Sequence, residues 1–273
     1  MTITPKSAAP GTPVLLGIPF DANSSWLRGA AGAPPIIRVA FLSDSANRST
    51  EAGVDLDVPG AYCDAGDLKF TFEEPFAAIE SKVGELLDLG LRPVCLGGDH
   101  SVTLPIVRAF GEHISDLTIF HFDAHPDLYD ELEGNRHSHA CPFARIMEAG
   151  AAKRLIQIGI RTMTTHQREQ AKRFGVEVIE MRHLPALDRM KVDGPVYISF
   201  DMDALDPAFA PGISHREPGG MSVREAIAHV QAITGRIAGA DIVEFNPAQD
   251  HTQITAMVAA KMLKEILGKM IAG

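Results

Sequence analysis

The sequence predicts one α/β domain in which helices cover both faces of a mainly parallel sheet. Short apolar runs alternate with longer amphipathic stretches along the chain, which is the pattern of an α/β layer fold. The apolar runs are hydrophobic at nearly every position, as strands buried on both faces are. No linker or repeat interrupts the 273 residues, a length that single α/β domains commonly reach. We expect only residues 1–12 to form a flexible N-terminal segment.

The pattern places strands and helices in alternation. The expected strands are Val14–Phe20, Arg92–Leu96, Leu117–Phe122, Arg154–Ile160, Val176–Glu180, Val196–Phe200 and Ala240–Phe245. The expected helices are Glu73–Leu89, Val102–His113, Pro142–Glu148, Thr165–Phe174, Ser222–Thr234 and Thr252–Leu267. In open parallel sheets, ligands bind outside the carboxyl ends of the strands. The residues that follow each strand are therefore the first place to look for function.

The composition argues against several classes of function. The chain carries 25 basic and 35 acidic side chains, a formal net charge of −10 at pH 7, whereas nucleic acids and anionic membranes bind basic surfaces. No apolar run approaches the ~18–20 residues that span a bilayer, and the first residues lack the apolar stretch of a signal peptide. Three scattered cysteines, Cys63, Cys95 and Cys141, fit reduced thiols. We expect a cytoplasmic protein suited to small cationic substrates and metal ions.

Polar clusters directly follow three of the expected strands. Residues 97–101 are GGDHS, residues 122–127 are FDAHPD, and residues 199–207 are SFDMDALDP. Alternate residues of an extended chain point to the same side, so that two carboxylates and an imidazole of the second motif project together, as do two carboxylates of the third. The side chains expected to converge are His100, Asp123, His125, Asp127, Asp201 and Asp203.

These six side chains indicate a metal site. Four carboxylates crowded at buried strand ends would repel one another and resist ionisation unless cations lay between them. One divalent ion needs fewer ligands, whereas two ions bridged by shared carboxylates use the whole set. Oxygen and imidazole ligands without thiolate suit Mn²⁺, with zinc, nickel, iron or cobalt as alternatives. Taken singly, each residue would more often be a helix cap, a turn residue or a satisfied histidine, but their runs directly after strands favour the metal site.

The three motifs resemble the signatures of the ureohydrolases, the arginase and agmatinase family. Residues 17–21, with Ser24-Ser25, Gly29 and Ile37-Arg38, resemble the N-terminal segment of that family, and residues 159–161 a later one. The resemblance therefore covers essentially the whole chain. It implies an αβα sandwich, a binuclear manganese centre with two Mn²⁺ ions, and hydrolysis of a guanidino group to urea and an amine. Members of the family commonly form trimers or hexamers, so a homo-oligomer is expected.

The resemblance also assigns roles to individual side chains. One ion would be held by His100, Asp123, Asp127 and Asp201, and the other by Asp123, His125, Asp201 and Asp203, with Asp123 and Asp201 bridging. A hydroxide formed from water between two divalent ions would be the nucleophile, and Asp127 would orient it and take its proton.

Two further residues match catalytic positions of the family. His139 corresponds to the histidine that shuttles protons, although Ala140 replaces the usual glycine, and His137 is the competing candidate. Glu244 matches the acid that grips the guanidinium in that family. A carboxylate at a buried strand end also requires a cationic partner, which a bidentate guanidinium supplies. An ion pair with an arginine of the protein is the alternative for Glu244.

The sequence departs from the family where the substrate's tail would bind. The usual Thr-Gly-Thr-Pro run is replaced by residues 213–216, ISHR, and the polar set with which arginases hold an α-amino acid is not found before His139. We therefore expect agmatinase-like specificity, for agmatine or a guanidino acid rather than arginine. His215 or Arg216 would contact the tail, and an inward Arg216 would favour a carboxylate. A surface position is the alternative for Arg216.

Other interpretations remain open at this point. A formimino or amide hydrolase would use the same metal site, and a metal-dependent phosphohydrolase would also use an Asp/His cluster. A non-catalytic relative should have lost metal ligands, yet all six are present.

Asp99 and Asp206 lie beside ligands and are expected to orient them or to serve as turn and cap residues. Cys141 is expected to pack in the interior.

Overall fold

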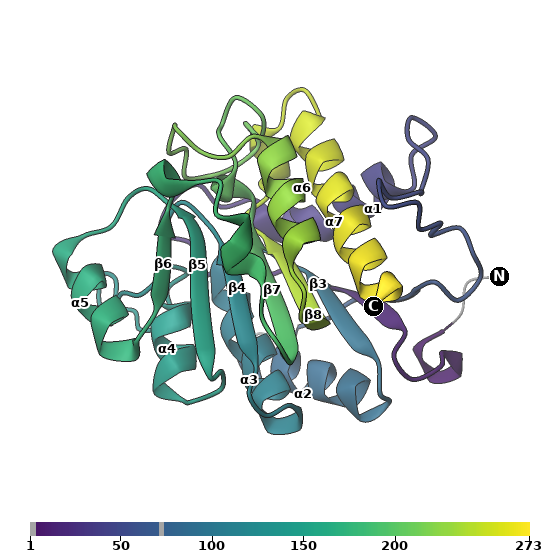
Figure 1. Ribbon diagram of the computed structural model, residues 1–273, viewed down its shortest axis with the longest axis horizontal. Helices are drawn as coiled ribbons and strands as arrows, with labels where there is room; N and C mark the ends of the chain where they lie inside the picture. Colours follow the sequence, from purple (N-terminus) through teal and green to yellow (C-terminus); the bar gives the residue numbers. More distant parts are fainter. Residues whose placement is uncertain (1–3, 71–73) are drawn as a thin grey trace.

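A sheet of eight parallel strands runs through the molecule (Figure 1), in the computed structural model that describes residues 4–70 and 74–273. The order across the sheet is β2-β1-β3-β8-β7-β4-β5-β6, and each neighbouring pair is parallel. The strands are β1 (Pro13–Gly17), β2 (Cys63–Asp67), β3 (Arg92–Leu96), β4 (Thr118–Phe122), β5 (Arg154–Ile160), β6 (Glu177–Glu180), β7 (Pro195–Asp201) and β8 (Arg236–Val243). All their carboxyl ends therefore lie at one edge.

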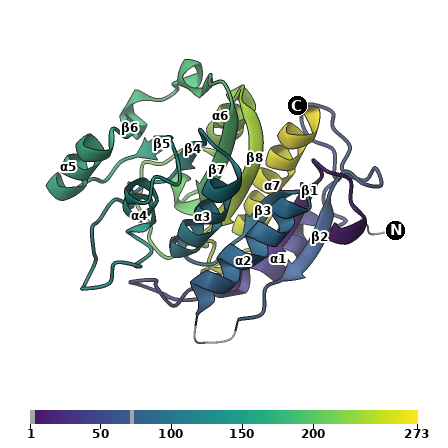
Figure 2. The same cartoon turned by 90° about the horizontal axis from the view of Figure 1, so that it is seen from below.

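Helices cover both faces of this sheet, as Figures 1 and 2 show. The helices are α1 (Ala33–Phe41), α2 (Pro75–Asp88), α3 (Thr103–His113), α4 (Pro142–Glu148), α5 (Thr165–Phe174), α6 (Val223–Ala232) and α7 (Ile254–Ala272). Helices α2 to α5 pack in sequence along one face, and α1, α6 and α7 along the other. The predicted αβα sandwich is confirmed.

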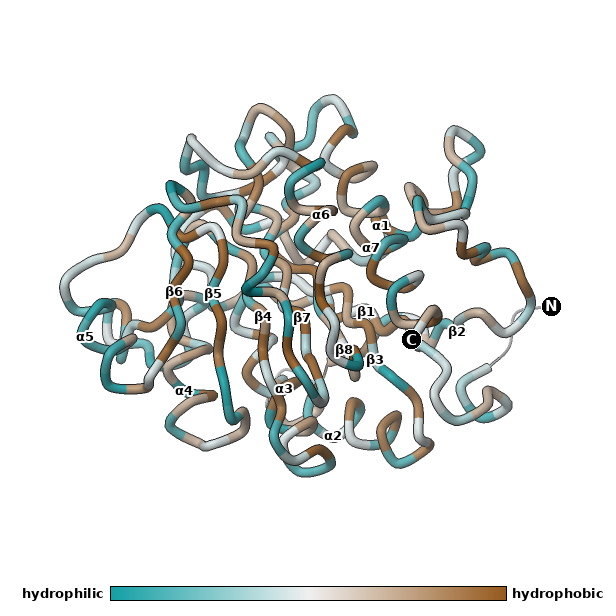
Figure 3. Tube along the Cα trace, in the orientation of Figure 1, coloured by the Kyte–Doolittle hydropathy of each residue, from teal (hydrophilic) through white to brown (hydrophobic). Residues whose placement is uncertain are grey.

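Two hydrophobic cores separate the three layers. Along β1, Val14 and Leu16 face the core beneath α2 and α3, while Leu15 faces the core beneath α1 and α7. The same alternation occurs in β4, where Ile119 joins the first core and Phe120 the second. Strands with two buried faces read as continuous apolar runs, and Figure 3 shows hydrophobic residues along the central strands.

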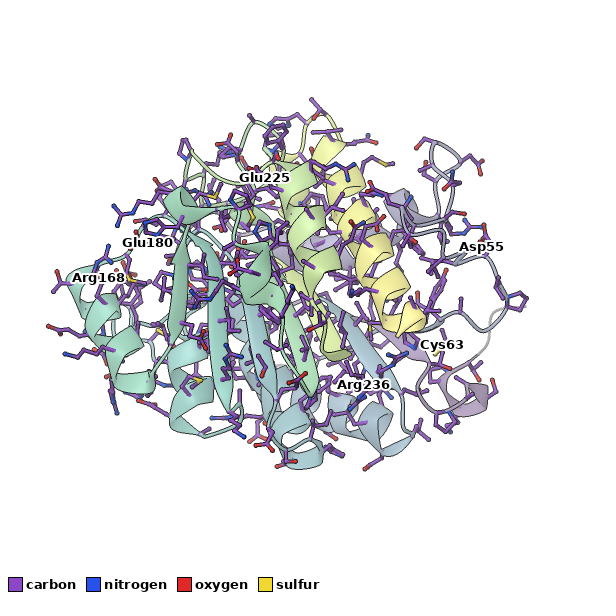
Figure 4. All side chains as sticks on the ribbon, in the orientation of Figure 1. Asp55, Cys63, Arg168, Glu180, Glu225 and Arg236 are labelled. Carbon is purple, nitrogen blue, oxygen red and sulfur yellow. The ribbon has the colours of Figure 1, made fainter. Side chains whose placement is uncertain are left out.

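Local signals explain where α5 begins and ends. The Thr164 hydroxyl accepts the Gln167 N–H at 3.3 Å, and the Gln167 side chain accepts the Thr164 N–H at 3.0 Å, a reciprocal cap that starts α5. Gly175 ends α5 in the left-handed conformation with φ 66°. Beside β6, the last strand of the sheet, Arg168 of α5 donates a hydrogen bond of 3.1 Å to Glu180 (Figure 4).

Some element boundaries differ from the expectations. The strand β2, with sequence CDAGD, carries two aspartates and a glycine at the sheet edge, so no apolar run signals it. Helix α1 is absent from the expected helices. Its Pro34 and Pro35 lie in its first turn, where no intrahelical N–H donor is needed. The first three residues of the segment expected to be flexible, and the start of the helix expected from Glu73, lie outside the described residues. None of the described helices is long and apolar enough to cross a membrane.

Candidate metal centre

The site residues expected from the sequence meet at the carboxyl ends of four adjacent central strands. In sheet order these strands are β3, β8, β7 and β4. His100 follows β3 and Glu244 follows β8. Asp201 ends β7, with Asp203 two residues later, and Asp123, His125 and Asp127 follow β4. Of the three neighbouring pairs, β3 with β8 and β7 with β4 are far apart in sequence, so the topology, rather than chain proximity, assembles the cluster. Six of these side chains have the oxygen and imidazole chemistry of a divalent metal site.

One group of possible ligands surrounds His100. Its Nδ1 lies 3.3 Å from Asp123 Oδ2, 3.1 Å from Asp127 Oδ2 and 3.1 Å from Asp201 Oδ2. The His100 side chain is fully buried, yet its Nδ1 makes no hydrogen bond of acceptable geometry with any described residue. Ligands about 2.1 Å from one ion and at right angles to each other would lie about 3 Å apart. The spacing therefore fits a cation between them.

A second group of possible ligands surrounds His125. Its Nδ1 lies 3.3 Å from Asp123 Oδ1 and 3.0 Å from Asp203 Oδ2. Asp123 thus turns one oxygen toward His100 and the other toward His125, as a carboxylate that bridges two ions would. Asp201 Oδ1 accepts the Asp203 N–H at 2.7 Å, which leaves its Oδ2 for the His100 side.

The electrostatics of the cluster favour bound cations. Burial and the carboxylates of Asp203 and Asp123 raise the pKa of Asp201 well above its usual value. Burial and the Asp123 carboxylate raise the pKa of Asp203 to about 6. Burial by itself lowers the pKa of His100. The surrounding carboxylates have the larger, opposite effect, so that the pKa of His100 is well above its ordinary value. The site therefore stabilises positive charge, and the residues present fit two divalent ions.

Strained backbone and close approach hold the strand ends in place. Asp127 and Glu244 adopt φ angles of 48° and 62°, a left-handed conformation that is uncommon for residues other than glycine and often occurs at functional sites. A Cβ atom at Gly98 would lie 1.8 Å from the carbonyl oxygen of Phe20, so only glycine fits there. The Gly98 carbonyl accepts the Glu244 N–H at 2.8 Å and joins the ends of β3 and β8.

Glu244 and His139 form a buried pair beside the metal cluster. The Glu244 Oε1 atom lies 3.0 Å from His139 Nδ1 and accepts the His100 N–H at 2.9 Å. Burial opposes ionisation of Glu244, but the hydrogen bond and charge of His139 hold its pKa below the usual value. Burial lowers the pKa of His139, and the hydrogen bond to Glu244 raises it more, to about 9. His139 Nε2 also lies 2.8 Å from the hydroxyl of Ser25.

A cavity of about 250 Å³ opens onto this centre. Its inner lining is His125, Asp127, Asp201, Asp203, His139, His215 and Glu244, and its outer lining is Ser25, Tyr129, Leu132, Ala140, Thr162, Thr164 and Gln167. None of the described residues that form the outer lining is charged. The outer lining offers hydroxyl and amide groups instead, from segments after β1, β4 and β5.

His215 and Arg216, both expected near the substrate's tail, lie in different places. His215 lines the cavity, with its ring centre 5.0 Å from that of His139. Arg216 is exposed, does not line the cavity, and donates to the Pro211 carbonyl and the Gln249 side chain. The geometry therefore gives no support to a role for Arg216 in reading a carboxylate.

Four other residues considered from the sequence lie outside the cavity lining. His137 packs against Phe76, with ring centres 5.3 Å apart, so the structure favours His139 as the cavity histidine. Asp99 accepts the Ser101 N–H as a helix cap, and Asp206 accepts the N–H groups of two glycines in a turn. Burial raises the pKa of the Cys141 thiol to about 12, in agreement with a packing role.

The sequence interpretation missed several polar residues behind the ligands. His121 lies two residues before Asp123 and contacts its Oδ2 at 2.7 Å, and Ser199 lies two residues before Asp201 and contacts His100 Nε2 at 2.9 Å. Extending the alternation of each motif one step back along its strand would have found both. The outer lining carries no comparable signal, because its residues come from several loops.

Comparisons with known proteins agree with this geometry. The model of the Arginase family matches residues 12–268. A curated arginase from Medicago truncatula is 44% identical over 95% of this chain and 82% of its own length, and an agmatinase from Bacillus anthracis is 34% identical over 93% and 90%. A solved structure of an arginase from Medicago truncatula superposes with a TM-score of 0.90, covering 96% of this chain and 88% of that one.

Proposed function

This chain belongs to the arginase family, and on that premise we propose that it binds two Mn²⁺ ions and hydrolyses L-arginine to urea and an amine. The family consists of hydrolases that act on carbon–nitrogen bonds of linear amidines, and this protein is a guanidino hydrolase of that kind. The choice of manganese, of arginine and of the individual site residues is the proposal.

The observation that carries the proposal is the set of carboxylates and imidazoles that line the inner part of the cavity. Four of the six expected metal ligands, His125, Asp127, Asp201 and Asp203, line its inner end. Glu244 also lines the cavity and has a lowered pKa. Among the described residues, hydrogen bonds to Glu244 fall on Oε1, which leaves Oε2 for a cationic group in the cavity. A guanidinium is planar, always charged and suited to a carboxylate partner.

The residues of the chain have separate tasks in the proposed reaction. When bound, two divalent ions supply a water molecule acidic enough to act as a nucleophile near neutral pH. The Asp127 carboxylate, at the cavity wall, orients that water and accepts its proton. Glu244 holds the guanidinium so that its central carbon faces the floor of the cavity. His139, whose raised pKa keeps it protonated at neutral pH, donates a proton to the leaving amine.

Arginine is the leading candidate substrate because the more similar relatives are named as arginases. Arginases from Medicago truncatula and rice are 44% and 46% identical to this chain, compared with 34% for the Bacillus anthracis agmatinase. The agmatinase-like specificity expected from the sequence stays a prediction, and agmatine is the second candidate. It is favoured by one observation, the lack of a charged side chain among the described residues of the outer lining, where the α-carboxylate of arginine would otherwise find a cation.

Three further expectations belong to the same proposal. We expect a homo-oligomer, either a trimer or a hexamer. We expect manganese, with zinc, nickel, iron or cobalt as alternatives, because the ligands are carboxylates and imidazoles without thiolate. The expected cytoplasmic location stays a prediction, and the plant arginases at 44–46% identity are named as mitochondrial proteins.

The test is a urea-release assay on protein loaded with manganese. Arginine, agmatine, guanidinobutyrate and guanidinopropionate would be compared at equal concentration, together with a formimino compound whose hydrolysis gives no urea. Urea from arginine in excess of that from agmatine would support the proposal, and the reverse order would support agmatinase-like specificity. A manganese-loaded protein that cleaves only the formimino compound would contradict both.

A further inference from the structure

A carboxylate behind the metal cluster has no role in the reaction described above. Asp241, in the middle of β8, is fully buried and forms no ion pair with any described residue. Its Oδ2 accepts the Thr103 hydroxyl at 2.8 Å and the Tyr197 hydroxyl at 2.7 Å, and its Oδ1 accepts the Ser199 hydroxyl at 2.8 Å. A buried carboxylate that is held only by neutral donors is costly, which calls for an explanation.

The chain of contacts continues from Ser199 to a metal-binding residue. Ser199 Oγ lies 2.9 Å from His100 Nε2, and both side chains are fully buried. A hydroxyl has one proton and two lone pairs. Because that proton goes to Asp241, the Ser199 oxygen can only accept at its contact with His100. The imidazole must therefore carry a proton on Nε2.

The other nitrogen of the ring shows the consequence. A neutral imidazole protonated on Nε2 has a lone pair on Nδ1. His100 Nδ1 is the buried nitrogen that makes no hydrogen bond and lies 3.1–3.3 Å from three carboxylate oxygens. Its lone pair is aimed at the point where a cation would sit.

We propose that Asp241 is a positioning residue that acts through the hydroxyl of Ser199 to fix the tautomer and orientation of His100, so that His100 Nδ1 is presented to one of the two metal ions. The inference rests on the proposed function only in requiring that the centre binds metal. Outer hydrogen bonds of this kind commonly change metal affinity by about 10–100-fold. Asp241 reaches only the His100 side of the centre, so the ion on the His125 side should not depend on it.

The test measures Mn²⁺ binding directly, by competition with a chromophoric chelator, in Ser199→Ala, Asp241→Asn and the double variant. We expect one of the two ions to bind about 10–100-fold more weakly in Ser199→Ala and the other to bind as in the original protein. Asp241→Asn should weaken the same ion, since an amide is a poorer acceptor than a carboxylate. In the double variant the second change should add nothing, because the path through Ser199 is already broken.

Tyr197→Phe is the matched control. It also removes a donor from Asp241, but it lies outside the path to His100, so both ions should bind normally. The rise in thermal midpoint on adding Mn²⁺ gives an independent readout, which should shrink in Ser199→Ala and Asp241→Asn and persist in Tyr197→Phe. Should Ser199→Ala fail to fold, Ser199→Cys keeps the side-chain volume and should weaken the same ion.

Two results would overturn the inference. One is normal binding of both ions in Asp241→Asn, and the other is full additivity of the two changes in the double variant, which would mean that Asp241 acts independently of Ser199. Failure of the original protein to bind manganese would instead overturn the metal centre itself. Loss of urea release with intact metal binding would bear on the proposed function alone.

Discussion

The two ends of the cavity are built in different ways. The metal end consists of His125, Asp127, Asp201 and Asp203, which follow β4 and β7, two strands that are hydrogen-bonded neighbours in the centre of the sheet. Most of the outer lining, namely Tyr129, Leu132, Thr162, Thr164 and Gln167, comes from the segments after β4 and β5 and from α5. One end is fixed by the sheet, and the other by loops.

This difference separates chemistry from specificity. At the metal end, charged groups are buried and spaced by backbone hydrogen bonds, so that small displacements would disturb both ions. At the outer end, neutral hydroxyl and amide groups can each contribute about 0.5–1.5 kcal/mol through a hydrogen bond. Substitutions at the metal end should therefore abolish turnover, whereas those at the outer end should change the preference between substrates.

The largest effect is expected from removal of Asp123, the carboxylate that we propose bridges the two ions. Asp123→Asn takes away the negative charge that faces His100 with one oxygen and His125 with the other. We expect urea release to fall by about 10³-fold or more, and manganese content to fall below two ions per chain. Asp116→Asn, at an exposed aspartate paired with Lys153, is the matched control and should retain both. Full activity in Asp123→Asn would disprove the bridging role.

His139 should follow in size of effect. His139→Asn removes the proposed proton donor while leaving the six proposed metal ligands in place, so kcat should fall by about 10²-fold or more with normal manganese content. Because the pKa of His139 is raised to about 9, its protonated form persists through neutral pH and is lost as the pH rises through that value. The pH profile of kcat should show a falling limb near pH 9 that the variant lacks. Retention of that limb would assign it to another group.

Glu244→Gln should have a smaller effect, confined to the guanidinium. The amide keeps the shape of the side chain but loses its charge, and a hydrogen bond to a charged group contributes about 1.5–3 kcal/mol. We expect kcat/KM for arginine to fall by about 10–100-fold. Metal binding should be retained, as equilibrium dialysis would show. If kcat/KM did not change, the guanidinium would have to bind elsewhere.

At the outer end, Thr162→Val should alter selectivity rather than activity. This change removes a hydroxyl from the cavity lining at nearly constant volume. If the hydroxyl contacts the α-amino or α-carboxylate group of arginine, the ratio of kcat/KM for arginine to that for agmatine should fall by about 2–10-fold. The matched control is Thr165→Val, at the first residue of α5 and outside the cavity lining, which should leave the ratio unchanged. Equal ratios in both variants would exclude Thr162 from tail recognition.

The same contrast explains how much the sequence could predict. The motifs at residues 122–127 and 199–207 lie within single strand ends, where the alternation of side chains relates sequence directly to geometry. The αβα fold followed from apolar runs that are buried on both faces. Tyr129, Thr162 and Gln167 come together only because β4 and β5 are neighbours, and hydroxyl and amide residues are common in loops of every kind. Asp241 gave no signal because it reaches His100 only through a serine on a third strand.

The smallest effect is expected for Arg216, for which the sequence offered an inward position and the structure shows an exposed one. An inward arginine would bind the carboxylate of a guanidino acid, but this side chain is exposed and donates to Pro211 and Gln249 outside the cavity. Arg216→Ala should therefore leave the ratio of kcat/KM for guanidinobutyrate to that for agmatine unchanged, because neither tail would lose a contact. A selective loss of guanidinobutyrate turnover would mean that the loop turns inward when substrate binds, and that charge recognition at the outer end comes from a residue the free cavity does not present.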